Sequence, residues 1–309
     1  MKFGLSLPHF RQVASPAAIR RVAQRAEQLG FDGIWASDHI VIPHAAVARL
    51  GAAFYEPLTV LGFAAACTST IRLGTTVIIL PYRNPLVTAK VLATLDVLSG
   101  GRLTLGVGVG STEEEYKALG VPFQSRGALS DEYLAAFNVL WTQPNPAFHG
   151  QYVRFENIAF EPKPIQKPRI PLWIGGNSRR AIRRAVAVGD CWHPTRPLAE
   201  DVRRGVAYLR EVCAQRGRDP ASLTVAVRQA LKFYAGAEAS VRRRPLLGSP
   251  QKIIDDLGQY QEVGVGYVML DTFYGVPELE HETVESMLAT IEQFAADVMR
   301  EFPHVPKRS

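Results

Sequence analysis

The chain has few cysteines and no long apolar run. Its three cysteines, Cys67, Cys191 and Cys213, lie far apart in a sequence of 309 residues and show no paired spacing. This pattern argues against a disulfide framework and against a zinc site, and it fits a reducing compartment. No apolar run approaches the ~18 residues that suggest a transmembrane helix, and the N-terminus carries no secretory pattern. We therefore expect a cytoplasmic protein that makes no use of a membrane.

The sequence also lacks a strong excess of charge. Its formal net charge is +6, and its lysines and arginines are mostly scattered along the chain. Nucleic-acid-binding proteins instead gather basic residues into a patch or stripe. We therefore expect no nucleic-acid partner, whereas anionic small molecules are compatible with the composition. With 47% hydrophobic residues the chain can bury a large core.

What the chain does contain is a weak repeat, in which an amphipathic helix ends at a glycine and a short apolar strand follows. The first helix shows the pattern most fully, with Ser15 as N-cap, Pro16 in the first turn and Gly30 as the stop. A strand over Gly33–Ser37 follows directly. The same hinge recurs before three more apolar segments, Arg102–Gly108, Cys191–His193 and Tyr267–Asp271. Helices and strands therefore alternate.

Eight apolar segments are strand candidates, and most are continuous runs, as buried parallel strands require. Besides the four segments above, they are Lys2–Leu7, Arg72–Ile79, Ile170–Gly175 and Leu223–Arg228. Eight strand–helix units predict an α/β fold, a closed (β/α)8 TIM barrel formed by a single domain over residues 1–309. The proline-rich stretch 143–168 predicts a small hairpin inserted between units four and five. An open doubly wound sheet is less favoured, because no G-x-G-x-x-G opens a helix after the first strand.

In such barrels the reactive groups lie at the C-terminal ends of the strands. Asp38-His39 follows the second strand. There an imidazole can exchange a proton near neutral pH, and a carboxylate can orient a partner. The same dipeptide is about as often a loop-capping pair. Its position at a strand end favours the catalytic interpretation.

A first glycine-rich strand end, Gly106–Ser111, precedes three glutamates in what we expect to be a capped first helical turn. These acids would repel a phosphate. Glycine here can simply allow a planar ring to lie against the backbone. We therefore assign Gly108 and Ser111 to contact with a ring or a substrate.

A second glycine-rich strand end, Gly175-Gly176-Asn177-Ser178, precedes a helix whose outer face carries four arginines. The glycines free backbone amides, Asn177 or Ser178 can add a donor, and the arginines raise the local positive potential. Together these features predict a bound anion at the helix N-terminus. A solvated basic face is the equally common alternative.

Five sequence blocks together resemble the luciferase-like family of flavin and deazaflavin oxidoreductases. They are M-K-F-G-L-S-L-P, L-G-F-D-G-I-W-A-S-D-H-I-V-I-P, L-G-T-T-V-I-I-L-P-Y-R-N-P, G-R-L-T-L-G-V-G-V-G, and P-L-W-I-G-G-N-S with A-V-G-D-C-W-H-P. They occur in the family's order and span nearly the whole chain. The Ser-Asp-His form resembles the branch that uses the 5-deazaflavin coenzyme F420. The resemblance implies a (β/α)8 barrel with an insertion, a flavin-like cofactor and hydride chemistry.

The resemblance also implies roles for individual residues. His39 matches the histidine near the reactive carbon of the deazaflavin and is the expected catalytic residue, while Asp38 matches the residue beside the ring. Thr76-Val77 falls where the family has a non-proline cis peptide bond against the back face of the ring. The Gly175-Gly176 turn matches the family's phosphate-binding turn, in agreement with the helix argument above.

Two departures from the family pattern concern the substrate. Ser111 stands where sugar-phosphate dehydrogenases of the family carry a catalytic glutamate, and Ile42-Pro43 replaces an expected tryptophan. These departures argue against a sugar-phosphate substrate and leave the substrate open. Candidates for the pocket wall, each equally compatible with ordinary packing, are Phe10, Tyr82, Trp192 and Phe273.

The sequence thus predicts an F420-dependent oxidoreductase that transfers a hydride to or from a small organic substrate, with His39 handling the proton. An FMN-dependent monooxygenase on the same fold and a non-catalytic flavin-binding paralogue are alternatives. A metal-dependent hydrolase would have to use His9, Asp38, His39 and His193. These residues lack the usual H-x-H or H-E-x-x-H spacing, so we expect no metal. Since the family often forms dimers through barrel helices, a homodimer is compatible with the resemblance.

Overall fold

A computed structural model of the chain describes residues 1–234, 244–279 and 281–303 and contains a closed barrel of eight parallel strands. In order around the barrel these are β1 (Lys2–Ser6), β2 (Gly33–Ala36), β3 (Arg72–Thr75), β5 (Leu103–Gly108), β8 (Leu172–Gly175), β9 (Cys191–His193), β10 (Thr224–Ala230) and β13 (Tyr267–Asp271). The ring closes because β1 pairs with β13 and β3 pairs with β5. The predicted (β/α)8 barrel is confirmed.

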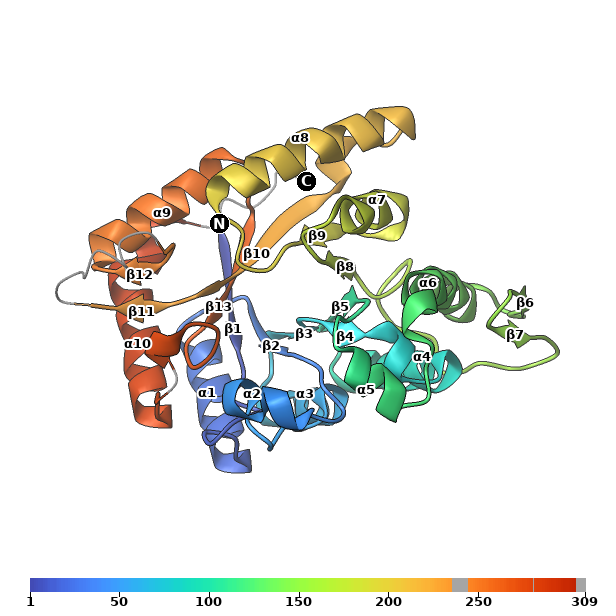
Figure 1. The fold of residues 1–309 in the computed structure, drawn as a ribbon, viewed down its shortest axis with the longest axis horizontal. Coiled ribbons are helices and arrows are strands. Elements are labelled where there is room, and N and C mark those ends of the chain that lie inside the picture. Colours follow the sequence, from blue (N-terminus) through green and yellow to red (C-terminus); the bar gives the residue numbers. More distant parts are fainter. Residues whose placement is uncertain (235–243, 280, 304–309) are drawn as a thin grey trace.

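Helices surround the strands as an outer ring (Figure 1). The longer ones are α1 (Pro16–Gln28), α3 (Pro57–Cys67), α4 (Pro85–Leu98), α6 (Arg126–Thr142), α7 (Arg179–Val188), α8 (Ala199–Gln215), α9 (Pro250–Glu262) and α10 (Val284–Asp297). The short helices α2 (Val47–Leu50) and α5 (Glu113–Ala118) come after β2 and β5 in the chain. The predicted devices of α1 are present: the Ser15 hydroxyl accepts from the amide of Ala18, and Gly30 follows the helix at φ +82°. No helix of the described residues is both long and apolar enough to cross a bilayer.

The predicted insertion is a small antiparallel hairpin formed by β6 (Phe148–His149) and β7 (Arg154–Phe155). It extends to one side of the barrel beyond α6 (Figure 1). A second small sheet lies after β10, where β11 (Lys232–Phe233) pairs in parallel with β12 (Leu247–Gly248).

Aromatic side chains fill the barrel interior. The rings of Trp35 and Trp173 lie 4.5 Å apart between centroids, and the Trp35 indole donates to the Tyr267 hydroxyl at 2.9 Å. Glycines on neighbouring strands make the room, because a Cβ on Gly4 or Gly74 would lie 2.3 or 2.2 Å from a Trp35 ring atom. The barrel is therefore a packed core rather than a channel, and a ligand has to bind at its mouth.

The third predicted strand is interrupted. β3 ends at Thr75, and β4 (Ile78–Ile79) continues in the same direction and pairs with β5. The Thr76–Val77 peptide bond between them is cis. It lies where the family resemblance placed such a bond, at the C-terminal end of the barrel.

Candidate functional site

His39 follows β2 at the barrel mouth, and a buried carboxylate holds one of its ring nitrogens. Its Nδ1 lies 2.8 Å from Oε2 of Glu115 in the first turn of α5. The His39 side chain is 19% exposed, whereas that of Glu115 is fully buried. Phe54 packs against the imidazole with 5.1 Å between centroids. No hydrogen bond from the described part of the chain reaches Nε2, so this nitrogen is available to a ligand.

Glu115 is held by more than His39. Its Oε1 accepts from the amides of Ile40 and Val41 at 2.6 and 3.2 Å, and its Oε2 also accepts from the Tyr82 hydroxyl at 2.8 Å. Burial alone would raise the pKa of this carboxyl, but the hydrogen bonds from His39 and the Ile40 amide lower it below its usual range. Glu115 is therefore ionised at neutral pH. Sequence reasoning missed its role, since it treated the glutamates here as first-turn helix residues that would repel a phosphate.

Asp38 is a buried support of the mouth. Arg83 donates to both of its oxygens, at 2.6 and 2.8 Å, and the amide of Ile79 donates at 2.9 Å. Arg83 also donates to Glu56 at 2.8 Å. The pair thus ties the end of β2 to the segment after β4. The sequence expectation had placed Asp38 beside a ring and had not singled out Arg83, although Arg83 lies in one of the family-like blocks.

Val77 forms an apolar floor at the mouth. Every residue from Leu73 to Tyr82 is buried except Val77, which is half-buried. A Cβ on Gly108 or Gly175 would lie 2.6 or 2.8 Å from a Val77 methyl carbon. These two predicted site glycines are therefore needed for the close approach of Val77. The Val77 side chain is therefore flanked by the backbone of two glycines and is partly exposed.

Thr76 is clamped from two sides. Its hydroxyl lies 3.0 Å from Nε2 of His193, and its carbonyl accepts from Arg228 at 2.7 Å. Arg228 is itself buried and donates twice to Asp271, both at 2.8 Å. A buried polar network thus fixes the segment that carries Val77.

Two of the mouth histidines are completely buried. His9 lies 2.7 Å from the Leu7 carbonyl and accepts from the Ser37 amide at 3.0 Å, and His193 lies 3.0 Å from the Ala226 carbonyl as well as bonding the Thr76 hydroxyl. Burial lowers the pKa of each to about 4, so both rings are neutral at physiological pH. Across the described ranges, no group of three or more His, Cys, Asp or Glu side chains is arranged to hold a metal ion.

The turn between β8 and α7 makes most of its side-chain bonds internally. Gly176 has φ +120°, a backbone angle that favours glycine. The Asn177 side chain donates to the carbonyl and accepts from the amide of Thr195, both at 2.9 Å. Ser178 caps α7 by accepting from the Ala181 amide at 3.2 Å. The predicted side-chain donors Asn177 and Ser178 therefore already have partners within the protein.

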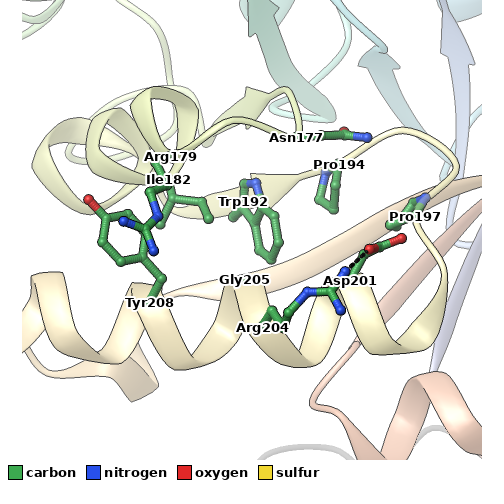
Figure 2. A pocket seen from close by; sticks show the side chains of 10 residues that line it. All are labelled: Asn177, Arg179, Ile182, Trp192, Pro194, Pro197, Asp201, Arg204, Gly205 and Tyr208. Carbon is green, nitrogen blue, oxygen red and sulfur yellow. Dashed lines mark hydrogen bonds and ion pairs between the residues drawn. The ribbon is translucent and has the colours of Figure 1, made fainter.

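A cavity of about 460 Å³ lies beside this turn, between α7 and α8 (Figure 2). It is lined by Asn177, Arg179, Ile182, Trp192, Pro194, Pro197, Asp201, Arg204, Gly205 and Tyr208. The Arg179 guanidinium lies over the Tyr208 ring, 4.7 Å from its centroid. Trp192 faces this cavity and not the barrel mouth, and its indole donates to the Gly176 carbonyl at 2.9 Å.

The other predicted residues are distributed around the mouth. Ser111 is exposed just beyond β5, and Thr112 occupies the N-cap position of α5 without a side-chain cap bond, so the expected side-chain capping is absent. Phe10 and Phe273 are buried against each other with 4.9 Å between centroids, which makes them packing residues. Tyr82 is also buried, and its hydroxyl donates to Glu115.

The chain is similar to known proteins in both sequence and fold. The family model described as luciferase-like monooxygenase matches residues 1–267. An uncharacterized protein of Mycobacterium tuberculosis is 34% identical over 278 residues, 85% of this chain and 96% of that protein. An FMNH2-dependent dimethylsulfone monooxygenase of Pseudomonas putida is 30% identical over 64% of this chain and 54% of that protein. The structure of an F420-dependent secondary alcohol dehydrogenase with an F420–acetone adduct has a TM-score of 0.78 at 18% identity, covering 96% of this chain and 98% of that one.

Proposed function

The chain belongs to the luciferase-like monooxygenase family, and from this premise we propose that it transfers a hydride between coenzyme F420 and a small organic substrate at the barrel mouth. The observation that carries the proposal is the state of His39. One of its nitrogens is fixed by an ionised carboxylate, and the other has no partner among the described residues. A histidine in this state can take up or release the proton that accompanies a hydride.

The residues at the mouth fit a planar, anionic cofactor. Val77, flanked by Gly108 and Gly175, offers a partly exposed apolar side chain to a ring. The N-terminus of α7, with Arg179 at its first position, offers backbone donors and positive charge to a phosphate and an acidic tail. When bound, F420 accepts or supplies the hydride at a carbon of its deazaflavin ring. The chemistry is thus the cofactor's, and the protein supplies binding and orientation.

We assign the following roles to this chain's own groups. Nε2 of His39 moves the proton to or from the substrate, a contribution typically worth about 10²–10⁴ in rate. Thr76 and Val77 support the back of the ring, and Asp38 holds the strand end beside it through Arg83. Ser111, which is exposed just beyond β5, is available to the substrate.

A second candidate function is an FMN-dependent monooxygenase. The relative from Pseudomonas putida, which is FMNH2-dependent, favours it. The same floor and the same helix terminus would suit the ring and the phosphate of FMN. The two candidates differ in the use of oxygen, which a monooxygenase consumes and an F420-dependent oxidoreductase does not require.

Parallel equilibrium titrations decide between the two cofactors. Four tryptophans are present, and binding of either cofactor is followed by quenching of their fluorescence. We expect F420 to bind at least about ten-fold more tightly than FMN, a difference of about 1.4 kcal/mol. Tighter binding of FMN would overturn the F420 assignment in favour of the monooxygenase, and binding of neither would overturn both.

A further inference from the structure

Glu115 is the third of three consecutive glutamates that open α5, and it alone turns inward. Glu113 and Glu114 are exposed, whereas the Glu115 side chain has no exposed surface. The donors to its carboxylate among the described residues all lie outside α5: His39, the amides of Ile40 and Val41, and the Tyr82 hydroxyl. The exposed pair already provides negative charge near the helix N-terminus. The inward orientation of Glu115 therefore needs another explanation.

The hydrogen bonds of Glu115 fix its orientation as well as its charge. A buried carboxylate is costly unless donors surround it. The amides of Ile40 and Val41 converge on Oε1, so this oxygen is fixed by backbone. Oε2 is left to face His39 and Tyr82. The carboxylate cannot rotate away without leaving two backbone donors unsatisfied.

This orientation determines which nitrogen of His39 carries the proton. An ionised carboxylate only accepts hydrogen bonds, so the neutral imidazole has to place its hydrogen on Nδ1. Nε2 then presents a lone pair, or donates when the ring is charged. We propose that Glu115 is the positioning residue of His39, which fixes the Nδ1–H tautomer and thereby directs Nε2 toward the reacting atoms. The inference rests on the proposed function for its catalytic consequence, but the tautomer itself does not depend on it.

The substitution Glu115→Gln tests the inference, because glutamine keeps the shape of the side chain and changes one oxygen into an amide. The amides of Ile40 and Val41 require the remaining oxygen, so the NH2 group is turned toward His39. It would then donate to Nδ1 and move the ring hydrogen to Nε2. A matched pair of controls removes other interactions nearby. Tyr82→Phe deletes the second donor to Oε2, and Glu56→Gln neutralises a carboxylate that binds Arg83 but makes no contact with His39.

The measurement is nitrogen NMR of isotope-labelled histidine in the cofactor-free protein at about pH 8.5, where an ordinary histidine is neutral. The chain has seven histidines, and His39→Gln assigns the signal. We expect the Nδ1–H tautomer in the wild type and in both controls, and the Nε2–H tautomer in Glu115→Gln. An Nε2–H ring in the wild type would overturn the inference even if Glu115→Gln failed to fold, and so would an Nδ1–H ring in Glu115→Gln.

A kinetic arm tests the consequence of the tautomer. With F420 and any substrate that the wild type converts, Glu115→Gln should lower kcat by about 10²–10⁴, the range of general acid–base catalysis. An orienting carboxylate replaced by its amide has a comparable effect in hydrolytic triads, where the tautomer becomes wrong. The affinity for F420 should stay within a few-fold. An unchanged kcat overturns the positioning role. Failure of F420 to bind the wild type counts against the proposed function alone, because the NMR result is obtained without cofactor.

Discussion

The three mouth histidines named above fall into two groups that differ in how their ring nitrogens are bonded. His9 and His193 are completely buried, and protein groups bond both nitrogens of each ring. His39 is partly exposed, and among the described residues only its Nδ1 has a hydrogen-bond partner. A ring with both nitrogens bonded and a pKa lowered by burial holds structure together. A ring with one fixed and one open nitrogen can exchange a proton with a ligand.

The same division applies to the acids beside these histidines. Asp38 and Asp271 are buried and paired with arginines, and these ion pairs hold strand ends together. Glu115 bonds a histidine and backbone amides, and no arginine contacts it in the described residues. Buried ion pairs fix geometry, whereas a carboxylate bonded to an imidazole fixes which ring nitrogen carries the hydrogen. The site therefore combines buried residues whose polar groups are all bonded to protein with one partly exposed residue, His39, whose Nε2 can bond a ligand.

The largest expected effect is the loss of catalysis when His39 is replaced. His39→Ala should lower turnover by about 10²–10⁴ with any accepted substrate while the cofactor affinity stays within a few-fold. The control is His44→Ala, which removes an exposed histidine five residues further along and should keep turnover within about two-fold. Stopped-flow absorbance of the cofactor measures the rate, and fluorescence quenching measures the affinity. If His39→Ala loses affinity but retains turnover per bound cofactor, His39 is a binding residue, and the contrast between it and the two buried histidines does not explain catalysis.

The next effect concerns the buried ion pair. Asp38→Ala should lower the free energy of unfolding by about 3–5 kcal/mol, because it leaves Arg83, whose side chain is only 15% exposed, without its bidentate partner. Glu56→Gln acts on the same arginine from a more exposed position and should cost less than about 1 kcal/mol. Urea unfolding of both variants provides the comparison. Equal costs would show that Asp38 is not the structural partner, and a loss of cofactor affinity without a loss of stability would make it a binding residue.

A third prediction concerns acid stability. The pKa of His9 and His193 is about 4 in the folded protein and about 6.5 in the unfolded chain, so below pH 6.5 only the unfolded chain binds the proton readily. The free energy of unfolding should therefore fall as the pH falls from about 6.5 to 4, by up to about 3 kcal/mol for each histidine.

The variant His193→Gln separates the contribution of one ring. The variant should be less stable at pH 7.5, because the substitution disturbs the two hydrogen bonds of the buried ring. Because glutamine does not titrate, the variant should lose less stability on acidification than the wild type. Urea midpoints at several pH values measure both slopes. Parallel slopes for the two proteins would show that the buried ring is not responsible for the acid sensitivity.

The smallest effect is expected at the helix terminus. Arg179 and Arg180 are exposed, and an exposed charge near a helix terminus is typically worth about 0.3–1 kcal/mol. If they attract the acidic end of the cofactor, the double variant to glutamine should weaken the salt dependence of F420 binding. Arg210→Gln, an exposed change on the neighbouring helix, should leave the slope unchanged. Identical slopes in all three proteins would remove the arginines from the binding site.

The barrel could be predicted from the sequence because each of the patterns that indicate it is local. Glycine stops such as Gly30, the N-cap Ser15 and continuous apolar runs act within a few residues, and the structure uses them as expected. The proline-rich insertion likewise forms its hairpin. The cis bond at Thr76–Val77 has no local cue and was accessible only through the family resemblance.

The site was less predictable because its decisive contacts join distant segments. His39 and Glu115 are 76 positions apart, and Arg228 reaches Thr76 across 152 positions. Nothing in the run of three glutamates distinguishes the inward one except its helical phase beside the buried Tyr116. The phase of Trp192 in its strand, between Cys191 and His193, could have indicated that it faces away from the barrel interior.

The most direct test of the proposed site is a crystal structure of the protein with oxidised F420 bound. The distance to measure joins Nε2 of His39 and the reactive carbon of the deazaflavin ring. We expect about 6 Å or less, close enough for one substrate atom to bridge the two, with the ring resting on Val77. A ring whose reactive carbon faces away from His39, or one seated in the cavity between α7 and α8, would contradict the assignment.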